Sequence, residues 1–424
     1  MNYFSEISDE EILAADISGA TEQDYFAEMD DEIFEQIEEP KKIDKNGIPL
    51  KPQYKDDTIF LTLYERIDVE KLKKLNANLD FYMAKVAEHR GERDHYDPVW
   101  RKTLHTGVSQ MIRICEENKT NKYEVTYKRK GKGRFFASHI QSEMSLQGLT
   151  REFRACIGAD YFDDIDIENC HPNILWMLGQ EELLDLDAVK YYCENREEML
   201  MKLMVCNRSR KLKRAKAKQY ILALMNGGLR WKGYNHPPEL DAFIADVEKM
   251  FFLYKEKYPD RYKKAEKIVK QKLKQNERDG NKWKNPSIYG TMLNVKFCER
   301  ESQILGVIFE YFQKIGVVTN EAVLCHDGVM VPKGKITKKI LEDCEEYIAE
   351  IFGYYFRLTK KPMHDIFSDI IKDQPVPETK KEKPKKDPVI FQYKKRPEKI
   401  HTNTEMKVSD ALYAMIMEMT GPKK

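Results

Sequence analysis

The spacing of hydrophobic positions along this chain predicts an α+β fold. Segments with helical spacing alternate with polar turns over residues 61–128, and helical spacing returns at 195–226, 239–275, 291–314 and 337–352. The segments 157–167 and 354–366 instead have the composition of strands. Residues 317–332 join two apolar runs through an Asp-Gly pair, which is typical of a β-hairpin. Because helices and strands are mixed in this order, we expect an antiparallel sheet accompanied by helices.

The two ends of the chain are too polar to predict a packed core. Residues 1–57 are acidic and have no sustained apolar period, so we interpret them as a disordered tail. The segment 373–424 begins with a Pro- and Lys-rich linker. It continues into VSDALYAMIMEMTG, whose apolar residues have helical spacing. This terminal helix suits docking on a partner protein or capping the body of the same chain.

Charge is distributed unevenly, although the formal net charge is only +1. Residues 1–40 contain 14 Asp or Glu and no Lys or Arg, and without them 72 basic residues face 57 acidic ones (71 minus 14), a charge of +15. A body of this sign suits a polyanion, because phosphates supply much of the affinity of proteins for nucleic acids. The basic, glycine-containing segment 128–134 suits a phosphate in the same way. A lysine-rich solvated surface explains the charge equally well.

Several classes of protein do not fit the sequence. The eight cysteines include no CxxC pair, which argues against a zinc ribbon and against a disulfide framework. No run of 18 apolar residues is present, so we expect no membrane span and no membrane partner. The first residues lack a basic segment followed by an apolar one, as a secretory signal would have. We therefore expect an intracellular protein of the cytoplasm or of a host nucleus.

Two acidic segments are candidates for a cation site. If the chain is extended at 164–168, then Asp164, Asp166 and Glu168 share one face of the strand. Asp327 lies at the turn of the predicted hairpin. Two carboxylates about 5 Å apart repel by roughly 3 kcal/mol at an effective dielectric near 20. Such a pair needs a cation, and Mg²⁺ suits oxygen ligands of this kind. Asp-Gly turns and acidic strand ends are also common without any such role.

A basic helix is predicted between these acidic segments. In the segment RAKAKQYILALMNGG (214–228), four residues spaced four apart lie on one face of the predicted helix. They are Arg214, Lys218, Leu222 and Asn226, so this face begins with two cations. Two cations one turn apart suit the phosphates of a nucleoside triphosphate. A basic amphipathic helix with a glycine cap is the simpler interpretation.

Together these segments resemble the motifs of superfamily A nucleic-acid polymerases, which include DNA polymerase I and the single-subunit phage RNA polymerases. The spacing of Asp166, His171, Asn173 and Leu175 is similar to that of motif A. Motif B has the spacing of Arg214, Lys218, Leu222, Asn226 and Gly227. Motif C resembles CHDGV at 325–329, with the pair His326 and Asp327 on a hairpin. The most similar branch is that of the transposon-virus polymerases.

The resemblance extends over about residues 128–366 and implies roles for individual residues. GRFFAS (133–138), SLQGLTREFRACI (145–157) and NPSIYGT (285–291) match further family segments in order. The implied metal ligands are Asp166, Asp327 and the backbone of Ile167. The implied nucleotide-binding residues are Arg214, Lys218, Leu222, Asn226, Gly227 and His171, of which Arg214 and Lys218 join the two aspartates in catalysis. The implied nucleic-acid contacts are Arg134, Gln147, Arg151, Arg154, Tyr289 and His326.

Four positions of motifs A and B depart from the family pattern. His171 stands where the family has Glu, Asn173 where it has Arg, Leu222 where it has an aromatic residue and Asn226 where it has Tyr. Tyr289 likewise replaces a Gln of the later segment. Because the family senses the sugar and the new base pair through the first four positions, the choice between deoxy- and ribonucleotides stays open.

The resemblance implies a right-hand polymerase with an antiparallel palm sheet, helical fingers and a reduced helical thumb. Its expected divisions are an acidic tail (1–57), a helical thumb-like region (58–127), the first part of the palm (128–205), the fingers (206–284), the second part of the palm (285–372) and a basic linker with a terminal helix (373–424). About 60 residues precede the thumb, too few for an exonuclease domain, so no proofreading is expected.

The implied function is DNA-directed DNA synthesis in the replication of a virus or mobile element. The expected ligands are a DNA primer-template, nucleoside triphosphates and two Mg²⁺ ions, with Mn²⁺ as an alternative, and the terminal helix is expected to bind a replication partner. Three alternatives stay open. They are a primer-synthesising RNA polymerase, a metal-dependent nuclease that uses Asp164, Asp166, Glu168 and His171 with Asp327, and a non-catalytic DNA-binding replication factor.

Overall fold

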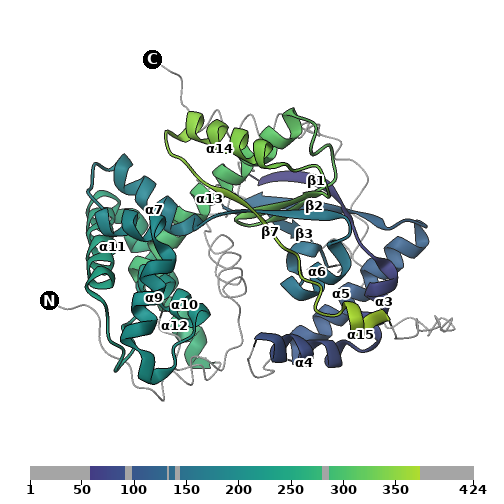
Figure 1. The fold of residues 1–424 in the computed structure, drawn as a ribbon, viewed down its shortest axis with the longest axis horizontal. Coiled ribbons are helices and arrows are strands. Elements are labelled where there is room, and N and C mark those ends of the chain that lie inside the picture. The colour runs from purple at the N-terminus through teal and green to yellow at the C-terminus, as the bar shows by residue number, and fades with distance from the viewer. Residues whose placement is uncertain (1–57, 91–97, 131–132, 139–143, 279–285, 373–424) are drawn as a thin grey trace, which may run out of the picture.

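The structure, a computed structural model, describes residues 58–90, 98–130, 133–138, 144–278 and 286–372 (Figure 1). It mixes helices with two antiparallel sheets, which confirms the predicted α+β class. The predicted acidic tail, the C-terminal linker and the terminal helix lie outside the described residues. Within the described residues, no helix is both long enough and apolar enough to cross a membrane. The right-hand architecture stays a prediction.

The first sheet has three strands in the order β1-β2-β3. Its strands are β1 (Thr58–Arg66), β2 (Lys122–Lys130) and β3 (Phe136–Ser138). In β1, Leu61 and Leu63 are buried while Phe60 and Tyr64 are exposed, the alternation of a strand with one buried face. β1 and β2 pair along nine residues each. The region 58–127, which we expected to be helical, therefore begins and ends with strands.

Helices fill the rest of that region and pack beneath the first sheet. They are α3 (Val69–Ala77), α4 (Leu79–Arg90) and α5 (Pro98–Glu117). The side chain of Asp68 accepts a hydrogen bond from the backbone N–H of Lys71, 2.9 Å away, and thereby caps the start of α3. After β3 follow η2 (Leu146–Gly148), which contacts β3 and β5, and α6 (Arg151–Gly158), which contacts η2 and α3. The last described helix, α15 (Ser368–Lys372), also packs against α3.

The second sheet has four strands in the order β5-β6-β4-β7 and carries the predicted acidic residues. Its strands are β4 (Phe162–Ile167), β5 (Val323–Cys325), β6 (Gly328–Pro332) and β7 (Leu358–Lys361). β5 and β6 form the predicted hairpin around Asp327. A Cβ atom on Gly328 would lie 2.6 Å from the carbonyl oxygen of Ile165 on β4, so only glycine allows the two strands to approach this closely.

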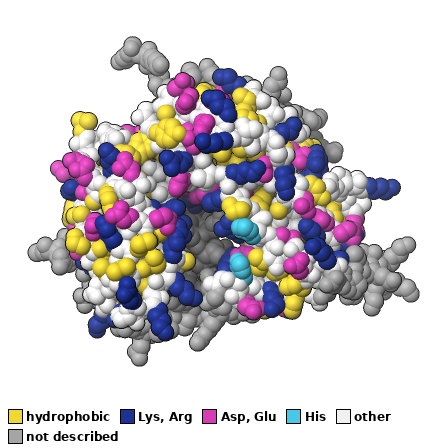
Figure 2. All heavy atoms as spheres, viewed as in Figure 1, with side chains coloured by type: hydrophobic (Ala, Val, Ile, Leu, Met, Phe, Trp, Pro, Cys, Tyr) yellow, Lys and Arg dark blue, Asp and Glu magenta, His cyan; other side chains and the backbone are white. Residues whose placement is uncertain are grey.

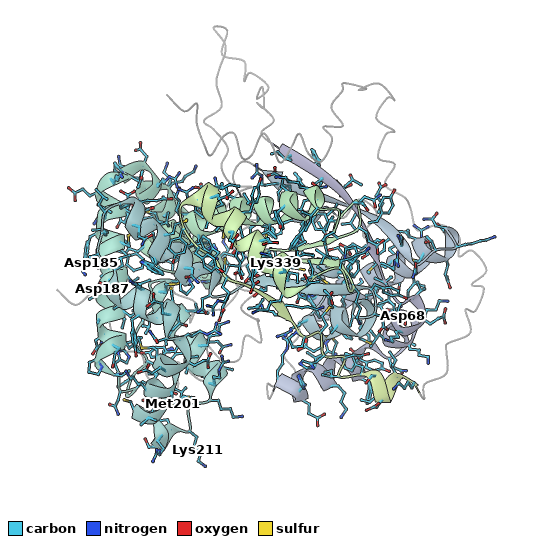
Figure 3. The ribbon with its side chains drawn as sticks, turned by 45° about the horizontal axis from the view of Figure 1, so that its top comes forward. Asp68, Asp185, Asp187, Met201, Lys211 and Lys339 are labelled. Atoms are coloured by element: carbon cyan, nitrogen blue, oxygen red, sulfur yellow. The ribbon has the colours of Figure 1, made fainter. Side chains whose placement is uncertain are left out.

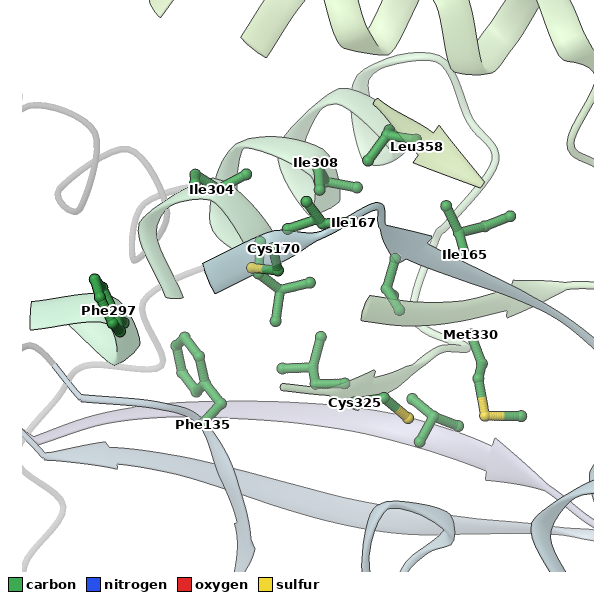
Figure 4. Close-up of a cluster of buried hydrophobic side chains, with 14 of the residues drawn as sticks. Phe135, Ile165, Ile167, Cys170, Phe297, Ile304, Ile308, Cys325, Met330 and Leu358 are labelled. Carbon is green, nitrogen blue, oxygen red and sulfur yellow. The ribbon is translucent and has the colours of Figure 1, made fainter. Parts of the chain in front are cut away.

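Two helices and the first sheet cover the second sheet. α13 (Ile288–Lys314) contacts β6 and is followed along the chain by the hairpin, and α14 (Lys338–Phe352) contacts both α13 and β7. Ile304 and Ile308 of α13 lie near Ile167 of β4 in the buried core (Figure 4). In the same view Cys325 and Met330 lie on the side of β1, which contacts β5. The apolar core is continuous from one sheet to the other.

A helical subdomain lies to one side of the two sheets (Figure 1). It consists of α7 (Cys170–Glu181), α8 (Asp187–Glu194), α9 (Arg196–Cys206), η3 (Arg208–Arg210), α10 (Arg214–Met225), α11 (Pro238–Lys257) and α12 (Pro259–Arg278). The predicted helix over 195–226 is thus interrupted after Cys206, and the predicted block 239–275 is two helices. α13 packs against α7, α11 and α12 as well as α14, so it connects the subdomain to the sheets.

A hollow separates part of the helical subdomain from the sheet-containing body, and Lys and Arg side chains gather along its rim (Figure 2).

The end of α10 approaches the start of α13 very closely. A Cβ atom on Gly290 of α13 would lie 1.8 Å from the carbonyl oxygen of Asn226 at the end of α10. Gly227 has φ +73°, a conformation that favours glycine, and its own added Cβ would lie 2.4 Å from Oγ of Ser287. The glycines therefore allow α10 to end directly on the start of α13.

Candidate functional site: an acidic pair on adjacent strands

Neighbouring strands bring Asp166 and Asp327 together. Asp166 of β4 lies opposite Gly328 of β6 and Thr359 of β7. The carbonyl of Asp327 accepts a hydrogen bond from the backbone N–H of Ile167, with an N–O distance of 3.1 Å. The two aspartates are therefore one step apart across adjacent strands, although 160 residues of sequence separate them. The structure thus brings together the two carboxylates on which the sequence analysis depended.

Asp166 is buried and Asp327 is partly buried, and desolvation raises the pKa of each. For Asp166, which is 8% exposed, the charge of Asp327 raises the pKa further, while the ammonium of Lys361 lowers it without restoring the ordinary value. For Asp327, the charge of Glu301 adds to the effect of burial, and Lys361 and Arg134 oppose it. Without a cation, the pair therefore favours holding a proton at pH values where an exposed aspartate is ionised.

Lys361 is the ion-pair partner of Asp166. It lies on β7, and its Nζ contacts Oδ2 of Asp166. The neighbouring Lys360 forms an ion pair of 2.8 Å with Asp163. The sequence analysis did not identify Lys361, because the two adjacent lysines at the end of a short strand gave no sign of which acidic residue they would face. The available signal was the strand-like spacing near 354–366, in which alternate residues point to opposite faces.

A second buried charge network supports the acidic pair. Glu301 of α13 is 1% exposed and accepts hydrogen bonds from Nε and Nη2 of Arg134, at 2.5 and 2.7 Å. Nε2 of His171 lies 2.8 Å from the same carboxylate. Burial alone would raise the pKa of Glu301, but the charge of Arg134 and the bond to His171 outweigh it and lower the pKa. Glu301 is thus ionised beside Asp327, and the sequence analysis also missed it.

His326 at the hairpin turn is partly buried and neutral. Its φ of +56° lies in the left-handed region, and its Nδ1 has no hydrogen-bond partner among the described residues. Burial, followed by the charge of Arg134, lowers the pKa of His326 to about 3. The ring therefore carries no charge at neutral pH and adds no cation to the site. The strained turn directs the following residue, Asp327, toward β4.

Most of the residues expected to contact nucleic acid are bonded within the protein. Arg154 is buried and donates from Nη1 to Sγ of Cys325 at 2.9 Å. Gln147 donates from Nε2 to the carbonyls of Phe135 and Leu324, at 2.9 and 2.7 Å, and so connects the two sheets. Arg151 is exposed, and its Nη2 lies 3.5 Å from the carbonyl of Pro362. These contacts stabilise the fold around the hairpin, and a direct role toward nucleic acid stays a prediction.

The predicted basic helix is α10, and its first cation is paired within the helical subdomain. Arg214 donates from Nε to Oε2 of Glu197 on α9 at 2.7 Å, and this bond lowers the pKa of Glu197 to about 2. Leu222 is buried, and Nδ2 of Asn226 donates to the carbonyl of Leu222 at 2.9 Å. Lys218 lies on the same helix and is partly exposed. The cation that contacts Asp166 is Lys361, and a role for Arg214 and Lys218 toward the phosphates of a nucleotide stays a prediction.

Residues from the end of α10 and the start of α13 meet in one junction. Asn226 and Gly227 lie against Ser287 and Gly290, as the close approach of the glycines requires. The ring of Tyr289 stacks on that of Phe251, with centroids 5.4 Å apart, and Tyr262 packs against it as well. Tyr289 is thus part of an aromatic cluster that connects α11, α12 and α13.

The donor set at the acidic pair fits a divalent cation that is shared with a ligand. Among the described residues, no three side chains of His, Cys, Asp or Glu are grouped as a complete protein cage for a metal ion. Mg²⁺, however, is usually bound by one or two carboxylates together with waters and phosphate oxygens. Asp166 and Asp327 provide two carboxylates, one buried and one partly buried. A contribution of the Ile167 carbonyl to the cation stays a prediction, and the N–H of the same residue donates to the carbonyl of Asp327.

Comparison with known proteins finds a similarity to a viral protein. No protein-family model matches the chain. The chain is 29% identical over 266 residues to a protein described as "Putative helicase V13" of Sputnik virophage, an alignment that covers 59% of this chain and 32% of the virophage protein. The chain thus spans about a third of the length of the curated relative that it matches.

This similarity corrects the functional prediction. The chain was expected to be a DNA-directed DNA polymerase, and the relative is instead described as a putative helicase, so that prediction is contradicted. The finding gives no support to nucleotidyl transfer, to primer synthesis or to a nuclease either. The resemblance to the motifs of superfamily A is not tested by the comparison and stays a prediction, so the motifs alone do not determine the activity.

Proposed function

We propose that this chain is a replication-associated enzyme module of a virus that acts on the phosphates of nucleotides in a helicase-like process. The observation that carries this proposal is the pair Asp166 and Asp327, which lie on adjacent strands and whose pKa values are both raised. Two carboxylates that burial and mutual repulsion make costly to ionise are a poor choice for stability alone. They suit a site that gains its charge balance from a cation and a bound ligand.

In this proposal Asp166 and Asp327 would hold Mg²⁺, with Mn²⁺ as an alternative ion. The cation would neutralise phosphate oxygens and make the phosphorus easier to attack. Glu301 and Arg134 would keep the Asp327 turn in position, because both are buried and bonded to each other beside it. Lys361 would balance the charge of Asp166 when no cation is bound.

The similarity to a putative helicase supports a nucleotide substrate. A helicase couples the hydrolysis of nucleoside triphosphates to the separation of strands. The chain contains no G-x-x-x-x-G-K-[ST] segment, the phosphate-binding loop of many nucleotide hydrolases. The acidic pair is therefore the candidate site within this chain for chemistry on a nucleotide phosphate, and about two thirds of the matched protein lie outside the alignment.

The test is release of phosphate from nucleoside triphosphates. The chain is incubated with each of the four nucleotides, Mg²⁺ and single-stranded DNA, with pyrophosphatase present so that cleavage at either anhydride is counted. We expect Asp166→Asn and Asp327→Asn each to lower the rate at least about 100-fold, the size of effect seen when one group that stabilises developing charge is removed.

Asp369→Asn is the matched control, because it makes the same chemical change at a side chain that is 96% exposed. It is expected to keep the full rate. Absence of phosphate release by the unmodified chain with all four nucleotides would disprove the proposal. So would equal rates for the unmodified chain and the two variants of the acidic pair.

A further inference from the structure

The segment between α9 and α11 has an extreme charge composition. Residues 207–236 contain nine Lys or Arg and no Asp or Glu. The whole chain has nearly equal numbers of both, 72 and 71, so this segment departs strongly from its surroundings. It includes η3, α10 and the loop that follows α10. Of these nine residues, only Arg214 and Lys218 have a predicted role beside the acidic pair.

Aromatic residues fold the loop after α10 back onto the helix. The rings of Tyr220 and Trp231 stack with centroids 4.2 Å apart, and the backbone N–H of Trp231 donates to the hydroxyl of Tyr220 at 3.0 Å. Lys216 lies over the ring of Trp231, at 5.1 Å from its centroid. Arg210 donates from Nε to the carbonyl of Gly233 at 3.0 Å. The basic residues of the loop are thereby held beside those of η3 and α10.

Four cations of this region are exposed and unbalanced, and together they define what we call the basic surface. They are Arg208, Lys211, Lys213 and Lys232. Within the part of the chain that the structure describes, none of these four forms an ion pair. Nearby acidic residues are engaged elsewhere, Glu197 with Arg214 and Asp241 with Arg230. Lys211 lies at one end of the helical subdomain, far from the sheets (Figure 3).

We propose that the basic surface binds the phosphate backbone of a nucleic-acid strand. Exposed cations in close succession bind a polyanion by releasing its counterions, which requires no particular sequence. The aromatic rings are occupied by each other and by Lys216, so the phosphates, rather than the bases, are the groups that this surface recognises. The surface is separate from the acidic pair, and the proposal depends on binding alone.

The test is a triple substitution, Arg208→Gln with Lys213→Gln and Lys232→Gln. Binding of a fluorescently labelled single strand is measured by anisotropy in the absence of divalent cations. We expect affinity at low salt to fall roughly tenfold or more, and the slope of log affinity against log salt to shrink by about 2, since each phosphate contact contributes about 0.7 on a single strand.

A matched control removes the same charge from a different helix of the subdomain. Lys263, Lys264 and Lys267 of α12 are exposed, and their joint replacement by Gln is expected to leave affinity within about twofold. Equal losses in both triple variants would show general charge attraction and would overturn the proposal, as would unchanged binding in the first variant. Stronger binding of the unmodified chain to vesicles of anionic lipid than to DNA would overturn it too.

The two proposals are distinguished by Asp327→Asn. This variant is expected to bind the strand as the unmodified chain does, while it loses phosphate release. If the unmodified chain binds DNA through the basic surface but releases no phosphate, the proposed function fails and the binding surface remains. If phosphate is released and the triple variant binds normally, the reverse holds.

Discussion

Asp327 is predicted to lower the stability of the chain when no cation is bound. Its folded-state pKa is raised by burial first and by Glu301 second, so the folded chain binds this proton more tightly than the unfolded chain does. The cost is absent below the unfolded pKa of about 3.9, grows as the pH rises and is complete above the folded pKa. We therefore expect Asp327→Asn to stabilise the chain at neutral pH by about 1–2 kcal/mol in EDTA.

Urea denaturation at a series of pH values measures this effect. The advantage of Asp327→Asn is expected to disappear near pH 3, where both chains are uncharged at this position. Saturating Mg²⁺ is expected to stabilise the unmodified chain and not the variant, because a cation that binds only the folded state adds stability. Asp369→Asn, at an exposed side chain, should stay within about 0.5 kcal/mol at every pH. Destabilisation of Asp327→Asn in EDTA would contradict the electrostatic account.

At the scale of single elements, α13 depends on one buried ion pair. Glu301→Gln keeps the size of the side chain but leaves the guanidinium of Arg134 without its carboxylate in the interior. Breaking a buried pair by removing one partner typically costs about 3–5 kcal/mol. We expect a loss of that order in the free energy of unfolding at pH 7, measured by urea denaturation, with Glu346→Gln on the exposed side of α14 as the control.

The pH dependence gives an independent check of this ion pair. The folded-state pKa of Glu301 is lowered, so its contribution is present above the unfolded pKa of about 4.3 and is lost as the pH falls toward the folded value. The difference between the unmodified chain and Glu301→Gln should therefore narrow in acid. If the difference in the free energy of unfolding stays constant from pH 7 to pH 3, the substitution acts through packing and not through the charge of Glu301.

The sequence predicted the long elements and missed those with an ambiguous pattern. The helices α13 and α14 and the hairpin at Asp327 follow from periodicity and turn chemistry, and they lie within a few residues of their predicted bounds. β1 was missed although Leu61 and Leu63 alternate with exposed residues, because a nine-residue strand beside three helices is outweighed by their pattern. Its partner β2 is rich in charged residues, which weakens the strand signal further.

The candidate site was predicted in part, for a reason that concerns the whole molecule. Asp166 and Asp327 were expected to meet because each occupies a recognisable local motif. Lys361 and Glu301 contact the site from β7 and α13, and no local pattern indicates which strand or helix will pack against which. The function could not be read from the motifs either, because residues of one kind in one geometry serve more than one activity on phosphates.

The junction between the helical subdomain and the sheets is predicted to determine whether the molecule unfolds as one unit. A Cβ atom on Gly290 would lie 1.8 Å from the carbonyl oxygen of Asn226, and a backbone atom cannot move away without separating α10 from α13. Gly290→Ala is therefore expected to destabilise the chain by about 1–3 kcal/mol, as overpacking does. Gly158→Ala is the control, because its nearest neighbours would be side-chain methyl groups at 3.5 Å and beyond.

Hydrogen exchange shows where the stability is lost. If the junction is the weak point between two cooperative units, Gly290→Ala should speed exchange in residues 214–228 and at the start of α13, while β4 and β6 keep their protection. The ladder between β4 and β6 does not involve the junction, which is why it should survive. Equal acceleration in β4 and β6 would mean that the subdomain and the sheets open together, and α13 would then be the centre of a single cooperative unit.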